Sequence, residues 1–193
     1  DIAGGSYPAV INILLALFNA KIQKKGSFLD ISMYENLIPL AWLGLSNLNA
    51  GKFDENQPLN LNGKLARYNI YETKDKKYIA LGALEDKFWI KFCNIIKAPE
   101  EIKLEKFSQS ILIDKVQSII KKHSEEYWKK KFDSENNACC STIKSLKEFM
   151  QDKHIKNKKL FSNNVIVNNK KLFAIPTILD RKLIKIKKNN IAP

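Results

Sequence analysis

Arginine is scarce in this chain, although the chain is strongly basic. It has 33 Lys plus Arg against 20 Asp plus Glu, a formal net charge of +13, yet only Arg67 and Arg181 are arginines. Such a charge raises nucleic acid or an anionic membrane surface as partners. Nucleic-acid recognition, however, favours the bidentate and stacking guanidinium, and the lysines are scattered among many Asn and Ile residues. We therefore expect no nucleic-acid partner, and a basic surface that helps to attract a small polyanionic ligand.

Cysteine is sparse as well. Cys93, Cys139 and Cys140 are the only three. Neighbouring cysteines rarely form a disulfide without strain, and no second pair has the spacing of metal ligands. We expect reduced thiols, no metal site and a cytoplasmic protein.

Long apolar runs are also missing. No segment reaches about 18 uninterrupted apolar residues, and the longest apolar run, from Tyr7 to Ala20, is interrupted by Pro8 and Asn12. Basic residues follow this run, whereas in a secretory signal peptide they precede it. We therefore expect no membrane partner. With 45% hydrophobic residues, the chain is too apolar to be disordered and forms one domain or parts of two.

The first 50 residues predict two helices and a short strand. Ser6 is placed to cap a helix with Pro8 in its first turn, which residues 24–26 end. Its apolar positions repeat at helical spacing and predict a buried stripe, formed by Val10, Ile13, Leu14, Leu17 and Phe18. The apolar run 28–31 reads as a strand.

The second helix begins at a capping box, in which Glu35 follows Ser32 by three positions. We expect it to run to about Ala50, with a kink at Pro39 and an end at Gly51.

Residues 51–65 are polar and predict a linker. After it, residues 68–73 and 78–81 predict a β-hairpin, and Glu85 falls at a strand-to-helix turn. An aromatic stripe at helical spacing follows, formed by Phe88, Trp89, Phe92, Ile95 and Ile96. Helices are predicted at 109–122, 124–132 and 145–151, and a second hairpin at 160–167 and 171–175.

Two carboxylates stand in settings that suit acid–base chemistry. Asp1 precedes the Gly4-Gly5 turn and a helix N-terminus, where backbone amides and the helix dipole stabilise an anion. Taken alone, an Asp before two glycines is more often a turn or cap residue. Glu85 at a helix start has an equally plain interpretation, a favourable contact with the dipole.

Several motifs occur together in an order that resembles the family III CoA transferases, in particular their α-methylacyl-CoA racemase branch. That branch has D-x-x-G-G before an apolar helix, then D-x-x-M, Y-x-x-Y-x-T, G-A-x-E-x-x-F and D-A-C-x-x-P-V. The corresponding residues here begin at Asp1, Asp30, Tyr68, Gly82 and Asn137. The chain departs from the pattern at Thr142, where proline is usual, and the family's C-terminal G-E-H-T segment has no counterpart.

The resemblance implies roles for particular residues. Asp1 and Glu85 would be catalytic. Substrate binding would involve the small residues beside them, Gly4, Gly5, Gly82 and Ala83. Removal and return of an α-proton requires two acid–base groups on opposite faces of the carbon. In the family one is the aspartate and the other a histidine upstream of it, which Glu85 would orient. Neither His123 nor His154 matches that histidine.

Two alternatives stay open. In family III CoA transferases the same aspartate is a nucleophile that forms a mixed anhydride and then an aspartyl-CoA thioester. Glu85 within G-A-x-E favours the racemase over the transferase. The other alternative is a basic binding module without catalysis.

The resemblance also implies an α/β architecture. A partial Rossmann-like large domain and a smaller α+β domain would belong to an interlocked homodimer. Residues 1–50 would end the large domain and form its connecting helix, 51–65 the linker, 66–145 the small domain, and 146–193 a segment returning to the large domain. We expect a piece of a longer protein, inactive by itself, with an acyl-CoA substrate and no separate cofactor.

Overall fold

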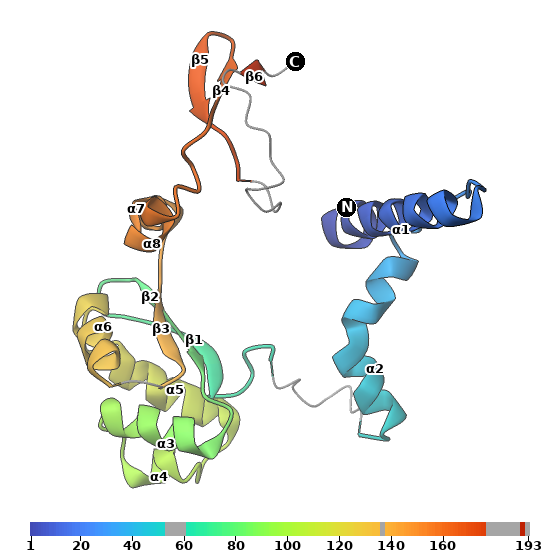
Figure 1. Ribbon diagram of the computed structural model, residues 1–193. Helices are drawn as coiled ribbons and strands as arrows, with labels where there is room; N and C mark the ends of the chain where they lie inside the picture. Colours follow the sequence, from blue (N-terminus) through green and yellow to red (C-terminus); the bar gives the residue numbers. More distant parts are fainter. Residues whose placement is uncertain (53–60, 136–137, 177–189, 192–193) are drawn as a thin grey trace. The chain divides into compact units, whose positions relative to one another are not determined.

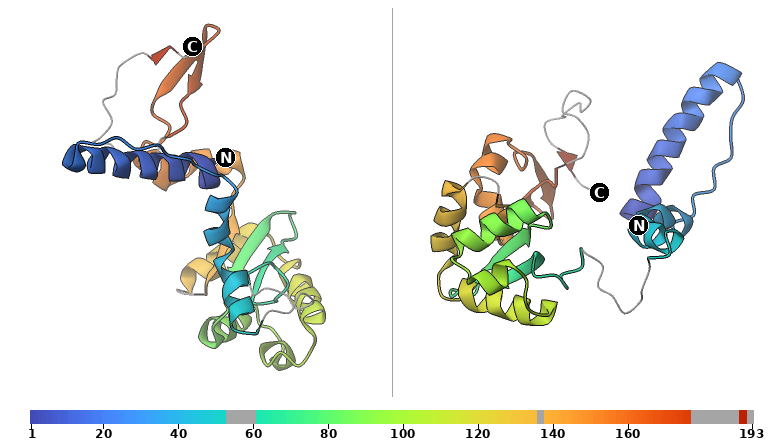
Figure 2. Two further views of the ribbon diagram at one scale, coloured as in Figure 1. Left: turned by 90° about the vertical axis from the view of Figure 1, so that its right-hand side faces the viewer. Right: turned by 90° about the horizontal axis from the view of Figure 1, so that it is seen from below.

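The computed structural model describes residues 1–52, 61–135, 138–176 and 190–191. The chain divides into two compact units, Asp1–Leu59 and Asn60–Pro193. Figures 1 and 2 show the elements of both units.

The first unit begins with a π-helical turn, η1 (Ile2–Ser6), that continues directly into helix α1 (Tyr7–Gln23). The predicted cap at Ser6 is wrong, because Ser6 is itself helical (φ −63°, ψ −43°) and its side chain makes no capping hydrogen bond. The helix ends at Lys24, which adopts a left-handed conformation with φ 56°.

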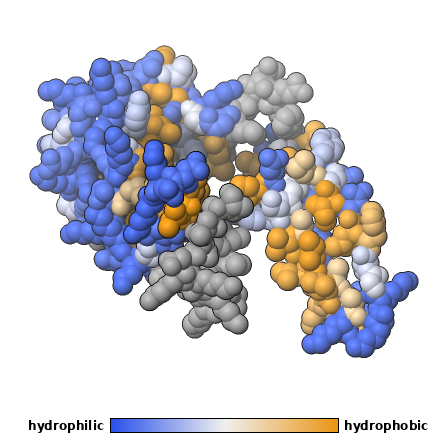
Figure 3. Space-filling view, turned by 90° about the horizontal axis from the view of Figure 1, so that it is seen from above, coloured by the Kyte–Doolittle hydropathy of each residue, from blue (hydrophilic) through white to orange (hydrophobic). Residues whose placement is uncertain are grey.

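The predicted stripe of α1 is not covered within this unit, since none of its side chains is buried. Figure 3 shows these apolar side chains as an orange surface along the helix. By length and composition the continuous helix Ile2–Gln23 is able to cross a membrane, a test that core helices and signal sequences also pass. The expectation of no membrane partner therefore remains a prediction.

The rest of the first unit departs from the predicted elements in two ways. No strand forms at residues 28–31, because the described part of this unit offers no second strand to pair with its backbone. The predicted second helix is divided: a 3₁₀ helix, η2 (Glu35–Ala41), contains Pro39, and α2 (Trp42–Asn49) follows. The chain then turns at Gly51 with φ +65°, as predicted.

The second unit is built on a three-stranded antiparallel sheet of order β1-β2-β3. Strands β1 (Tyr68–Glu72) and β2 (Tyr78–Gly82) form the predicted hairpin, with Tyr68 opposite Gly82. Strand β3 (Cys140–Ile143) pairs with β2. It was not predicted, because its four residues gain a strand partner only from a distant part of the chain.

Four helices lie between β2 and β3 in the sequence: α3 (Asp86–Ile95), α4 (Glu100–Lys103), α5 (Gln109–Ile120) and α6 (Glu125–Ser134). They pack on one face of the sheet (Figure 1). The predicted aromatic stripe is confirmed as core, with Trp89 and Phe92 fully buried beside Tyr71 and Ile79 of the sheet. The opposite face is open, and Ile70 on it is 58% exposed.

The chain continues through α7 (Leu146–Gln151) and α8 (Lys153–Asn157) to a second hairpin, β4 (Asn164–Val167) and β5 (Lys170–Phe173). Asn168 and Asn169 both have positive φ values, 48° and 59°, as a tight two-residue hairpin turn requires. This hairpin was predicted, and its strands are shorter than the predicted ranges 160–167 and 171–175. β6 (Asn190–Ile191) runs parallel to β4.

The predicted mixture of helix and sheet is confirmed. Both hairpins are antiparallel, and the Rossmann-like character of the large domain stays a prediction, as do the domain boundaries.

Candidate active site

Asp1 lies at the start of the helical segment formed by η1 and α1. Its backbone carbonyl accepts hydrogen bonds from the amides of Gly5 and Ser6, each 2.8 Å long. These two amides are therefore not available to a ligand. The Asp1 side chain is exposed, directly before the first helical residue of this segment.

Gly4 and Gly5 allow this turn to pack closely on the segment before η2. A Cβ atom on Gly4 would lie 2.6 Å from the carbonyl oxygen of Met33 and 2.9 Å from Cγ of Leu37. Gly4 is buried, and its own carbonyl accepts a hydrogen bond of 3.1 Å from Nδ2 of Asn36. The close approach thus fixes where Asp1 stands relative to η2.

Glu85 is the residue between β2 and α3, as predicted. Its backbone is extended (φ −75°, ψ 141°), and its carbonyl accepts hydrogen bonds from the amides of Phe88 and Trp89. The side chain makes no capping hydrogen bond and is exposed. No ion pair of this carboxylate occurs within the described ranges, so it is available to a group outside them.

Arg67 fixes the turn that carries Glu85. Its Nη1 donates to the carbonyl of Leu84 at 2.9 Å and to Oδ1 of Asp86 at 2.6 Å. Arg67 thus binds the residues on both sides of Glu85. Its Nε and Nη2 donate to Oε2 of Glu105 at 3.0 and 2.6 Å. The guanidinium also lies over the ring of Trp89, 5.6 Å from its centroid.

The charge of Arg67 is stabilised where it stands. Burial opposes the charge, but the hydrogen bonds to Glu105 and Asp86 outweigh this cost and raise the pKa of the guanidinium. The planar fork of donors serves three acceptors at once, which the ammonium of lysine does with less precision. This role was not predicted from the sequence. The available signal was an arginine in a chain that otherwise uses lysine.

Gly82 and Ala83, the predicted binding residues of the second unit, are held at the end of the sheet by backbone hydrogen bonds. The amide of Gly82 donates to the carbonyl of Cys139, and that of Ala83 donates to the carbonyl of Arg67, both at 2.8 Å. Ala83 is fully buried. Gly82 lines a hollow of about 590 Å³ beside the open face of the sheet, together with Tyr68 and Cys139.

The three cysteines are free thiols. Burial raises the pKa of Cys93 to about 12 and also raises the pKa of Cys140. Both thiols are therefore held neutral and unreactive at neutral pH.

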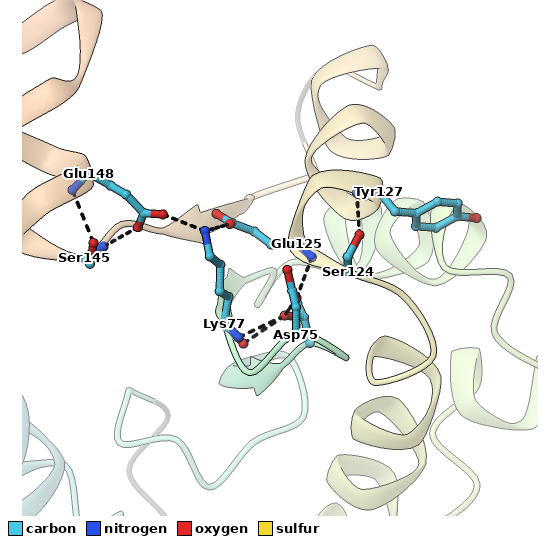
Figure 4. Close-up of polar contacts among 8 residues, drawn as sticks. Asp75, Lys77, Ser124, Glu125, Tyr127, Ser145 and Glu148 are labelled. Carbon is cyan, nitrogen blue, oxygen red and sulfur yellow. Dashed lines mark hydrogen bonds and ion pairs between the residues drawn. The ribbon is translucent and has the colours of Figure 1, made fainter.

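A second polar cluster anchors α6 and α7 to the β1–β2 turn (Figure 4). Nζ of Lys77 lies 2.8 Å from Oε2 of Glu125 and 2.6 Å from Oε1 of Glu148. Asp75 accepts from the amide of Glu125 at 3.0 Å. This cluster connects elements and contains neither predicted catalytic residue.

Asp1 and Glu85 belong to different units, and the catalytic and binding roles of all six predicted residues stay predictions. His123 is engaged in a stack with Tyr127, with ring centroids 3.9 Å apart. Among the described residues, no cluster of His, Cys, Asp and Glu is able to hold a metal ion.

Residues 1–183 match the model of CoA-transferase family III. The chain is similar to the α-methylacyl-CoA racemases of Mus musculus and Homo sapiens, with 24% and 23% identity over 162 and 164 residues. Each match covers 82% of this chain and 42% of the racemase. A CaiB/baiF CoA-transferase family protein of Caenorhabditis elegans is 32% identical over 90 residues, 46% of this chain and 26% of that protein.

Among solved structures, the orthorhombic crystal form of Rv3272 from Mycobacterium tuberculosis is similar, with a TM-score of 0.65 and 16% identity. The likeness covers 93% of this chain and 49% of that one. At this identity it concerns the fold alone. The chain thus spans less than half the length of the racemases and of this structure.

Proposed function

This chain belongs to CoA-transferase family III, and from that premise we propose that the protein is an acyl-CoA racemase that removes and returns the α-proton of 2-methylacyl-CoA thioesters. The observation that carries the proposal is the setting of Glu85. It is an exposed carboxylate on a turn that Arg67 holds rigid, within the G-A-x-E motif that resembles the racemase branch.

In this proposal Asp1 acts as one acid–base group and a histidine outside the 193 residues acts as the other. A base on one face of the α-carbon removes the proton, and an acid on the opposite face returns one. Glu85 acts through the histidine: a carboxylate that accepts its N–H fixes the tautomer and raises the basicity of the imidazole. The amides of the first turn after Asp1 supply partial positive charge that stabilises the enolate oxygen.

The remaining features follow from the same proposal. The CoA thioester is the substrate and no further cofactor takes part. Gly5 and Gly82 contribute to substrate binding on their respective turns, and the buried Gly4 and Ala83 hold the backbone beside them. The complete protein is a cytoplasmic, interlocked homodimer in which this chain is the end of the large domain and most of the small one.

The proposal is tested by α-proton exchange. The protein, as the 193-residue chain and in any longer natural form, is incubated with a 2-methylacyl-CoA in deuterated water and the mass of the thioester is followed. We expect the longer form, which supplies the histidine, to take up one deuterium and the 193-residue chain to take up none. In the longer form, Glu85→Gln should lose the uptake. Glu101→Gln, which removes an exposed carboxylate of α4, is the matched control and should exchange normally.

The transferase alternative predicts a different result. No deuterium would enter the thioester, and hydroxylamine would trap an acyl group on Asp1, because the aspartate would have acted as a nucleophile. Binding to nucleic acid at physiological salt, with a steep salt dependence, would instead support the basic binding module.

A further inference from the structure

A second hollow, of about 600 Å³, lies in the helical layer of the second unit. It is bounded by the end of α3, by α4, α5 and α6, and does not include Glu85, Arg67 or Gly82. Its wall is mostly aliphatic, with Ile95, Pro99, Ile102, Ile111 and Ile119, and the rings of His123, Tyr127 and Trp128 complete it. A hollow of this size is within the range that holds a small organic ligand.

The deep part of this hollow is built from core residues, while its rim is exposed. Ile102 is 4% exposed and Trp128 2%, whereas Ile111 on α5 keeps 46% of its surface in water. Covering such a side chain with hydrocarbon is favourable, at about 25 cal/mol for each Å² of apolar area removed from water. The wall therefore suits an apolar, flexible occupant.

The rim of the same hollow is positively charged. Lys97, Lys115 and Lys122 line it, with Asp114 as the single acidic residue, which leaves three positive charges against one negative. Within the described residues Lys97 and Lys122 have no carboxylate partner, and Lys115 lies 4.4 Å from the ring centroid of Phe107.

Several other lysines of this unit form ion pairs. Lys77, Lys103 and Lys121 each lie within 2.9 Å of a glutamate oxygen. The three lysines at the hollow thus provide an excess of positive charge over the single carboxylate of Asp114. Their long stems can reach along an apolar wall while the ammonium groups stay in water.

From the mostly aliphatic wall and this excess of positive charge we propose that the hollow binds an aliphatic carboxylate, with the hydrocarbon against the isoleucines and the carboxylate between Lys97 and Lys122. The wall offers little to a ligand that must be read by hydrogen bonds, since Ser118 already donates its hydroxyl to the carbonyl of Asp114. Of the two aromatic side chains that α6 contributes to the wall, Tyr127 and Trp128, the ring of Tyr127 is already stacked on His123. These contacts favour a fatty acid over a nucleotide, and the site does not depend on the proposed racemase activity.

The proposal is tested by titrating the full chain with decanoate in a calorimeter. We expect binding at one site, and affinity about fivefold lower in the double variant Lys97→Gln and Lys122→Gln, because two exposed ion pairs are lost. Ile111→Gln should also weaken binding. Lys130→Gln is the matched control: Lys130 is an exposed lysine of α6 that pairs with Glu126 outside the hollow, and its loss should leave the affinity unchanged.

Decanol and ADP distinguish a carboxylate site from an apolar patch and from a nucleotide site. Equal affinity for decanol would show a merely apolar patch, and displacement of decanoate by ADP would show a nucleotide site. The helix α1 also exposes apolar side chains that decanoate could cover. If the variants of the hollow bind decanoate as tightly as the original chain does, the decanoate binds outside the hollow. Each of these three results, or the absence of binding, would overturn the proposal.

Discussion

At the scale of single residues, Arg67 connects the candidate catalytic turn to the core. It holds Leu84, Asp86 and Glu105 through four hydrogen bonds and covers the ring of Trp89. Its side chain is 18% exposed and that of Glu105 24%, whereas Asp86 is 81% exposed. The bond to Glu105 therefore contributes more to stability than the bond to Asp86, which water screens.

We expect Arg67→Met to lower the free energy of unfolding by about 1–3 kcal/mol, because the carbonyl of Leu84 and the partly buried Glu105 lose their donor. Urea unfolding followed by circular dichroism measures this. The control, Lys130→Met, removes an ion pair whose two side chains are 77% and 76% exposed and should change stability by less than about 0.5 kcal/mol. Equal effects of the two substitutions would contradict the role of Arg67.

A second prediction at this scale concerns Gly4. We expect Gly4→Ala to destabilise the first unit by about 1–3 kcal/mol, because the new Cβ would overlap the backbone of Met33 and force a shift. Gly44→Ala is the control. Gly44 lies in α2 with nothing within 4 Å of an added Cβ, so alanine should stabilise the helix by up to about 1 kcal/mol. Thermal melting measures both effects. If Gly4→Ala and Gly44→Ala shift the melting temperature in the same direction, the packing argument is contradicted.

At the scale of elements, α7 is attached to the sheet by Glu148, which serves two partners. Its Oε2 accepts from the amide of Ser145, completing a capping box, and its Oε1 pairs with Lys77 (Figure 4). The hydrogen bond from Lys77, followed by that from the Ser145 amide, lowers the pKa of Glu148 from 4.5 to about 2.

The sign of the resulting pH dependence follows from this shift. A carboxyl group with a lowered pKa stabilises the fold above its unfolded value and loses that contribution as the pH falls from 4.5 to about 2. We expect Glu148→Gln to flatten the dependence of unfolding on pH in this window, while the amide oxygen keeps the cap. Glu101→Gln should leave the slope unchanged, and identical slopes for Glu148→Gln and the original chain would exclude the ion pair as the cause.

At the scale of the whole molecule, α1 leaves a large apolar surface uncovered. Leu14, Leu17 and Phe18 are each more than 60% exposed, and contiguous surfaces of this kind mark places where another protein surface or a membrane binds. The chain spans 42% of the length of the racemases that it resembles. In the proposed complete protein this helix belongs to the large domain and would be covered there.

We therefore expect the 193-residue chain to self-associate in solution. Light scattering after size exclusion should show oligomers, and the double variant Leu14→Glu and Phe18→Glu should shift the population toward the monomer, because it places charge on the apolar surface. Asn19→Glu adds one charge to the same helix at a position that is already polar and should have little effect. A sharp monomer that melts cooperatively without any substitution would contradict this prediction.

Local sequence signals were sufficient for much of the second unit. Asn168 and Asn169 predicted a tight hairpin turn, and the structure gives both the positive φ angles that such a turn requires. Ser124 accepts a hydrogen bond from the amide of Tyr127 at the start of a predicted helix. These features depend on residues a few positions apart, so the sequence by itself determines them. The position of Glu85 between a strand and a helix was predictable for the same reason.

The tertiary structure decided what depends on distant partners. Residues 140–143 become a strand because β2 offers them a free edge, whereas residues 28–31 are apolar enough for a strand but remain without one. Arg67 acquires its role only when Leu84 and Glu105 are brought to it by the fold. A hydrogen bond or a strand pair needs both members in place, and only folding of the chain brings together members that lie far apart in the sequence.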